Sequence, residues 1–316
     1  MPFRLIRRFV LTLAAGALVI LAAVAVIPFI ASTQIVRDRI AFELSMWSGY
    51  EVTLGEAPQI DVWPFRANLA NVTFTQWGDK SQPVIEAEAI EVDLSAFAAL
   101  RGNVVFTYLR LVRPTLHIRQ DDLRRPTPGW GGGRIGRSIK AAHEVLGANP
   151  TSPDASLLPS DPLGTLEFED GRVLLHRGGR ESEIFSSASG RVNWPAFNRS
   201  ATGRITGIWR GELVTLDIST EQPLFLMAGG TAPLKLSLQS APLTGSFEGI
   251  ANLSGDTHFD GNASLSSPSL RRILEWSRAD IVPGAVVGSV SLESQLSGSL
   301  GRLKLVNTTL TLEQNR

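Results

Sequence analysis

The sequence predicts a mainly β protein: a single N-terminal transmembrane helix, followed by an antiparallel β-sheet of many short strands with a few short helices. Three observations lead to this fold class. Residues 9–31 form an apolar run of twenty-three residues without one charge. From Tyr50 onward, apolar residues recur at a spacing of two, which is typical of half-buried antiparallel strands. Turn residues such as those at 178–179 and 260–262 separate many of these runs.

The apolar run at 9–31 is the predicted membrane anchor. A helix rises about 1.5 Å per residue, so this run is about 34 Å long and crosses a hydrocarbon core of about 30 Å. Arg4, Arg7 and Arg8 precede it. Because an excess of lysine and arginine marks the cytoplasmic side, residues 1–8 are predicted to be a cytoplasmic tail. We therefore expect a single-pass membrane protein whose N-terminus is cytoplasmic and whose remaining 285 residues lie outside the cytoplasm.

A cleaved signal peptide is the competing interpretation of the same segment. It also combines a basic start with an apolar run, and Ala23-Val24-Ala25 resembles a small-x-small cleavage site. The apolar region of a signal peptide is usually about 7 to 15 residues long. Here the apolar residues continue past the candidate site to Ile30. An uncleaved anchor therefore fits the pattern better.

Residues 32–119 are predicted to hold a helix followed by strands. Ser32 or Thr33 can cap the helix, and Gly49 is placed to end it. Runs with a period of two then follow up to Ile118, with prolines between them or at their edges. The apolar positions of the helix recur at three- and four-residue spacing; they are Val36, Ile40, Leu44 and Trp47.

Residues 120–161 are predicted to be a linker, because prolines and a glycine run interrupt the strand rhythm. Within it, apolar residues between Ile135 and Leu146 line one face of a short helix that ends near Gly147, and Arg134, Arg137 and Lys140 lie on another face. Two interpretations of this helix stay open. It either covers a sheet or rests on a membrane surface.

Residues 162–316 are predicted to be a second β-rich region. The strand runs include Leu224 to Met227, and a helix is expected from Ser267-Pro268 to Arg278. The last run continues almost to Arg316 without a closing element. Repeating β architectures normally end in a cap. We therefore expect that the chain is truncated here or that its terminal strand meets a partner.

Composition and motifs exclude several function classes. The chain of 316 residues has 30 basic and 30 acidic residues, so no summed positive field attracts nucleic acid. It has no cysteine, and its four histidines lie far apart without metal-ligand spacing. Neither a G-x-S-x-G elbow nor a Walker loop is present. The sequence thus predicts no catalytic residue, no cofactor and no metal, and we do not expect an enzyme.

Two stretches resemble one known family. The segment SGYEVTLGEAPQIDVWPFRANLANVTFT and the run LRLVRPTLHIR resemble the N-terminal region of AsmA-like proteins. The resemblance implies a single-pass inner-membrane-anchored periplasmic protein of a Gram-negative envelope, related to bridge-type lipid transfer proteins. It also implies that the antiparallel β-sheet is elongated, curved and groove-like, with an apolar groove. Members are commonly longer than this chain. The matching positions are Gly49, Val52, Trp63, Pro64, Leu69, Val72, Pro114 and Leu116.

Two functions follow as expectations from the pattern and the resemblance together. In the first, one apolar sheet face holds phospholipid acyl chains for transport toward the outer membrane. In the second, the anchored sheet is a scaffold that binds outer-membrane or periplasmic assembly proteins through its edges. The same alternation also builds an ordinary sandwich core without any ligand. The candidate lipid-lining residues are Val52, Leu54, Leu69, Val104, Phe106, Leu116, Leu213, Leu216, Leu236, Phe247 and Val290.

Overall fold

The computed structural model describes most of the chain after the predicted anchor. The predicted tail at 1–8 and anchor at 9–31 lie outside the described residues. Among the residues that are described, none of the helices has the length and apolar character needed to span a membrane. The described ranges are 34–62, 65–94, 106–120, 126–127, 132–252, 258–277, 287–299 and 302–314.

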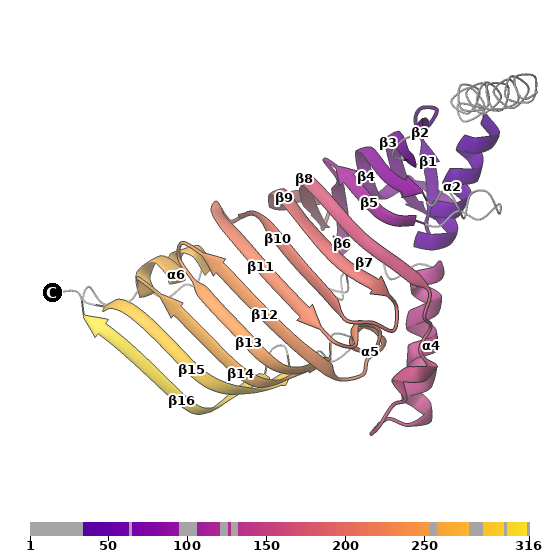
Figure 1. Ribbon diagram of the computed structural model, residues 1–316. Coiled ribbons are helices and arrows are strands. Elements are labelled where there is room, and N and C mark those ends of the chain that lie inside the picture. Colours follow the sequence, from indigo (N-terminus) through magenta and orange to yellow (C-terminus); the bar gives the residue numbers. More distant parts are fainter. Residues whose placement is uncertain are drawn as a thin grey trace, which may run out of the picture.

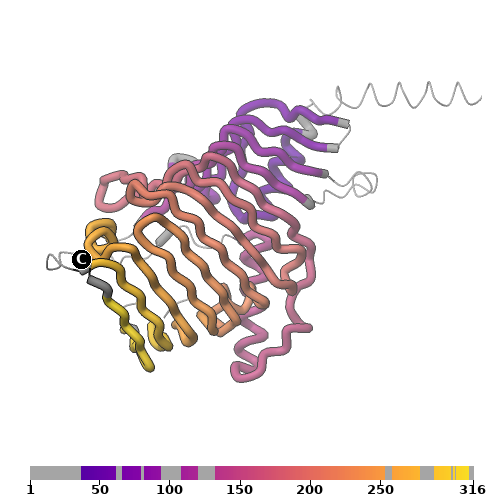
Figure 2. Tube along the Cα trace, turned by 60° about the vertical axis from the view of Figure 1, so that its left-hand side comes forward, coloured from indigo at the N-terminus to yellow at the C-terminus, as the bar shows by residue number. Residues whose placement is uncertain are grey.

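The described strands form one long, curved sheet (Figure 1), which confirms the mainly β prediction. Strands from both sides of the predicted linker belong to it, and most neighbours in space are neighbours in sequence (Figure 2). The strands are β1 (Glu51–Leu54), β2 (Gln59–Val62), β3 (Phe65–Gln76), β4 (Asp79–Leu94), β5 (Phe106–Val112), β6 (Thr115–Gln120), β7 (Pro126–Thr127), β8 (Pro162–Arg177), β9 (Arg180–Ala196), β10 (Ala201–Trp209), β11 (Glu212–Thr220), β12 (Ala232–Ser240), β13 (Thr244–Asn252), β14 (His258–Ser267), β15 (Val287–Ser299) and β16 (Arg302–Gln314).

One junction departs from the expected antiparallel pairing. Strand β8 pairs in parallel with both β5 and β6, for example Leu109 with Leu166 and His117 with Leu174. Parallel neighbours need a long crossover connection, usually a helix. The predicted linker supplies it, because it contains helix α4 (Arg134–Ala148) and the 3₁₀ turn η1 (Ala155–Leu157). The linker therefore joins two parts of one sheet.

The two faces of the sheet from β8 onward differ in chemistry. On one face, apolar residues pair across the strands, as in the row of Ile218, Leu236 and Phe247. On the other face, polar residues pair in the same way, as in the row of Asp217 and Ser237. Because successive side chains of a strand point to opposite faces, the alternation seen in the sequence separates an apolar side from a polar side.

The helix predicted before Gly49 is confirmed as α2 (Gln34–Ser48), and it covers the apolar side of the sheet at its N-terminal end. Ile40 and Leu44 of α2 pack into one buried cluster with residues of β1, β3 and β4. The helix is also tied by its polar groups, since Arg37 donates a hydrogen bond of 2.7 Å to the carbonyl of Leu54. Gly49, with φ of +84°, lies directly after the helix.

The predicted strand at Leu224–Met227 is wrong, because this segment is helix α5 (Pro223–Ala228). A short apolar run has no period that separates a strand from a buried helix. The local signals favour the helix: Pro223 occupies its first turn, and Gly229 ends it in the left-handed conformation. α5 packs against α4 and the turn after β9, in a buried cluster with Trp194 and Phe197.

The helix predicted after Pro268 is confirmed as α6 (Leu270–Ser277). It lies at the opposite ends of the strands from α5 (Figure 1). Its Trp276 contacts Trp209 edge-on, with ring centroids 4.8 Å apart, and donates a hydrogen bond of 3.2 Å to the Trp209 carbonyl. Arg272 forms an ion pair of 2.8 Å with Glu212. α6 is therefore held against the turn between β10 and β11.

Candidate apolar binding surface

A continuous apolar surface, which we call the apolar face, runs across strands β10 to β16. Cross-strand pairs connect it from Ile205 to Leu216, from Leu265 to Leu292, and onward to Leu310. Its members are Ile205, Val214, Leu216, Ile218, Leu234, Leu236, Leu238, Phe247, Ala251, Phe259, Ala263, Leu265, Val290, Leu292, Leu296, Leu305, Leu310 and Leu312.

The apolar face is only partly buried. Leu265 keeps 41% and Leu310 keeps 56% of its surface exposed, whereas Leu69 under α2 is completely buried. Ile205, Leu216 and further members are intermediate. Within the described part of the chain, α5 and α6 lie at the two ends of these strands, and neither extends along the face between them (Figure 1). α5 covers one end of the face, where its Leu226 packs in a buried cluster with Leu234 and Phe247. Over the rest of the face the described residues provide no second layer.

Glycines let the strands approach closely on this surface. Gly249 of β13 and Gly261 of β14 are paired, and a Cβ atom added to Gly249 would lie 2.2 Å from the Asp260 carbonyl oxygen. Only a residue without a side chain fits such a contact. At Gly245 the side chain of Leu265 occupies the missing space instead.

The structure divides the predicted lining residues into separate environments. Val52, Leu54 and Leu69 are buried beneath α2 in the N-terminal cluster. Val104 lies outside the described residues, and of Phe106 only the backbone in β5 is described. Leu216, Leu236 and Phe247 belong to the apolar face, and Val290 pairs with Leu312 of the same face. Five candidates outside the N-terminal cluster are half-buried or buried: Leu116, Leu216, Leu236, Phe247 and Val290.

Leu213 lies on the opposite side from Leu216. It is 63% exposed and pairs with Ile208 on the polar face. Residues three apart in a strand point to opposite faces, so these two leucines cannot line the same surface.

A small pocket lies on the apolar side of the sheet, where α2, α4 and α5 meet strands β5, β8 and β9. Its volume is about 170 Å³ and its lining is almost entirely apolar. Sequence reasoning missed this pocket because its lining comes from six elements that no local spacing connects. Its apolar side chains include Leu44, Trp47, Ile135, Leu166, Trp194 and Met227.

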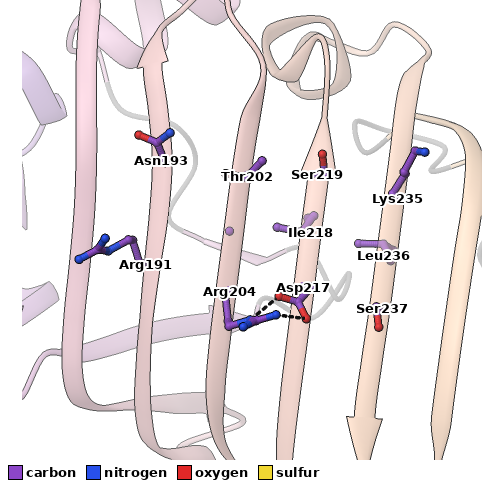
Figure 3. A pocket seen from close by; sticks show the side chains of 11 residues that line it. Arg191, Asn193, Thr202, Arg204, Asp217, Ile218, Ser219, Lys235, Leu236 and Ser237 are labelled. Atoms are coloured by element: carbon purple, nitrogen blue, oxygen red, sulfur yellow. Dashed lines mark hydrogen bonds and ion pairs between the residues drawn. The ribbon is translucent and has the colours of Figure 1, made fainter.

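The polar face has a wider hollow of about 480 Å³ between β9 and β12 (Figure 3). Arg204 donates to both carboxylate oxygens of Asp217, at 2.6 and 3.2 Å. Lys235 pairs with Glu248 at 2.5 Å, and Arg191 pairs with Glu167. Each of these cations is matched by a carboxylate, so the hollow has no excess charge to attract an ion.

Charged and aromatic groups also meet near β5. Tyr108 donates a hydrogen bond to Glu167, which also forms an ion pair with Arg191. Burial and this hydrogen bond raise the pKa of Tyr108 to about 12. The same hydrogen bond lowers the pKa of Glu167. These interactions stabilise the pairing of β8 with β5 and β9.

Two histidines that are distant in the sequence meet in the sheet. His117 Nδ1 lies 2.9 Å from His176 Nε2, and His117 Nε2 lies 3.0 Å from Glu86. His117 is 7% exposed, on the polar side of its strand. In the described residues no three histidine, cysteine or carboxylate side chains are grouped so that they could hold a metal ion.

No family model, no curated protein and no solved structure matches this chain. The geometry of the apolar face and the motifs of the sequence are therefore the basis for assigning a function.

Proposed function

We propose that the protein is an inner-membrane-anchored periplasmic protein of the AsmA-like type. In this proposal it acts in cell-envelope biogenesis, and its apolar face is the floor of a groove that binds phospholipid acyl chains for transport toward the outer membrane. The anchor is the apolar run at 9–31, and its orientation follows from the three arginines before it.

One observation carries the proposal: the apolar face is large and continuous, yet several of its leucines stay partly exposed. Core residues of a filled sandwich are interdigitated with a second layer. Leu265 and Leu310, at 41% and 56% exposure, have no such layer among the described residues. An extended apolar surface that stays exposed on a folded protein marks a binding surface.

Acyl chains match this surface in chemistry and in scale. Each methylene removed from water contributes about 0.8 kcal/mol. A lipid therefore has to keep most of its methylenes covered to leave a bilayer without a large cost, which requires a continuous apolar path. The unbroken pairing from Ile205 to Leu310 supplies such a path. Dispersion and desolvation act here, so the proposal assigns no chemical step and no cofactor.

In vivo photocrosslinking tests the proposal. A photoreactive amino acid replaces Leu216 or Leu265 on the apolar face, and Leu213 serves as the matched control. Leu213 and Leu216 share strand β11 and differ in the face they occupy. We expect phospholipid to be captured at positions 216 and 265 and not at 213. Equal capture at all three, or none at 216 and 265, contradicts a lipid-binding face.

A scaffold for outer-membrane protein assembly is the second candidate. It is favoured by β16, which pairs on one side only, with β15, among the described strands. A free strand edge can add a strand from a partner protein. The same photocrosslinkers separate the two functions, because a scaffold yields protein adducts along β16 and no lipid adducts on the apolar face.

A further inference from the structure

The small pocket between α2, α4 and α5 has the character of a chain-end site. It is enclosed by helices on one side and by the sheet on the other, whereas the apolar face is open. Leu44 and Trp47 come from α2, Ile135 from α4 and Met227 from α5. Almost no polar atom reaches it, so water gains few hydrogen bonds inside. An apolar pocket of this kind therefore favours apolar guests over water.

The strands that line the pocket are direct neighbours of the strands that carry the apolar face. Its lining includes Leu166 and Val192, which are paired with each other in β8 and β9. Val192 is in turn paired with Gly203 of β10, on the same side as Ile205 and Leu216. The pocket therefore lies at the inner end of the row that the apolar face continues toward β16.

The size of the pocket limits what it can hold. A cavity of about 150 Å³ accommodates benzene, which has six carbons. At about 170 Å³, the pocket accepts about six carbons of a linear chain. It is too small for a sterol or a lipid headgroup, and its lining offers no cationic partner for a phosphate.

We propose that this pocket receives the methyl end of one fatty-acyl chain, whose remaining length lies along the apolar face. This inference rests on the proposed lipid-binding function and adds an orientation of the bound lipid: the methyl end of its acyl chain points toward α2, and its headgroup lies over the later strands of the sheet. The affinity would then depend on the length of the acyl chain, since each additional methylene buried in the pocket strengthens binding about fourfold.

Photoreactive phospholipids test this orientation on the full-length protein in nanodiscs of phosphatidylethanolamine and phosphatidylglycerol. One probe carries a diazirine at the terminal acyl carbon, and the other carries it close to the ester. We expect the terminal probe to label peptides containing Trp47, Ile135 and Met227, and the ester-proximal probe to label β10 to β15. Labelling of the apolar face by both probes alike contradicts the inference and leaves the proposed function standing. No labelling by either probe contradicts both.

Variants of the pocket sharpen the test. Met227→Trp fills the pocket and, by excluding about two methylenes, should weaken terminal labelling of the Ile135 peptide about fifteenfold. Met227→Ala enlarges it and should favour probes with longer chains. Leu213→Trp adds the same indole on the polar face and should change nothing. If Met227→Trp does not fold, Ile135→Phe replaces it as the filling variant. Unchanged terminal labelling in a folded filling variant refutes the chain-end site.

Discussion

Two leucine-to-alanine substitutions distinguish a covered core from an open face by stability alone. Leu69 is completely buried beneath α2, whereas Leu265 is 41% exposed on the apolar face. Truncation of a buried leucine costs about 2–5 kcal/mol, because it loses transfer free energy and leaves a cavity. We therefore expect Leu69→Ala to lower the free energy of unfolding by an amount in that range.

Leu265→Ala should cost much less. The substitution removes three carbons, worth about 0.8 kcal/mol each when fully buried. With 41% of Leu265 exposed, about 1.4 kcal/mol remains, and no closed cavity forms because the site is open to solvent. Urea unfolding of both variants, followed by circular dichroism, measures the difference. A loss above about 3 kcal/mol at Leu265 would show that the face is covered, since only a packed layer over it produces such a loss.

Three further predictions concern the attachment of α6, the hydrogen bond of Tyr108 in β5 and the close approach of β13 to β14. Trp276→Ala should release α6, because the contact with Trp209 contributes about 0.5–1.5 kcal/mol beyond buried area; hydrogen exchange at 270–277 measures this. Tyr108→Phe should make the free energy of unfolding less dependent on pH above pH 10. The pKa of Tyr108 is raised from 10.0 to about 12, so the stability that Tyr108 contributes is fully present below pH 10 and is lost as the pH rises through the folded pKa. Gly249→Val should distort the β13–β14 pairing, detected as loss of strand signal in circular dichroism.

Each of these has a contradicting result. Unchanged exchange of α6 in the Trp276→Ala variant would mean that the ion pair of Arg272 alone holds the helix. An alkaline limb that survives in Tyr108→Phe would assign it to other groups. Native strand content and stability in Gly249→Val would show that the close backbone approach is not needed for the sheet.

The period-two pattern predicted the sheet because alternation follows directly from strand geometry. The same geometry separates Leu213 from Leu216, which are three apart in one strand, so their placement on opposite faces was readable from spacing. The helix at 34–48 was predicted by its spacing, but its position over Leu69 was not. Which surface a helix covers depends on contacts between distant segments.

Other features could not be predicted from periodicity. The segment 224–227 is short and apolar, so the signals for a helix come from Pro223 and Gly229 at its ends and from packing beside Trp194. The pocket unites residues from Leu44 to Met227, so only the folded sheet brings them together. The parallel junction of β8 depends on where the crossover through α4 returns. The candidate binding surface was therefore predictable in character, while its covered part and its pocket were not.

Fluorescence quenching is the decisive test of an open, lipid-binding apolar face, because the sequence has no cysteine that would compete for a label. Leu216→Cys and Leu213→Cys each introduce one labelling site, on the apolar and the polar face of β11. A fluorophore is attached at each site, and phospholipid with a spin label on its acyl chain is added. We predict strong quenching at position 216 and little at position 213. Equal quenching at both positions, or none at 216, would contradict an open face that binds acyl chains.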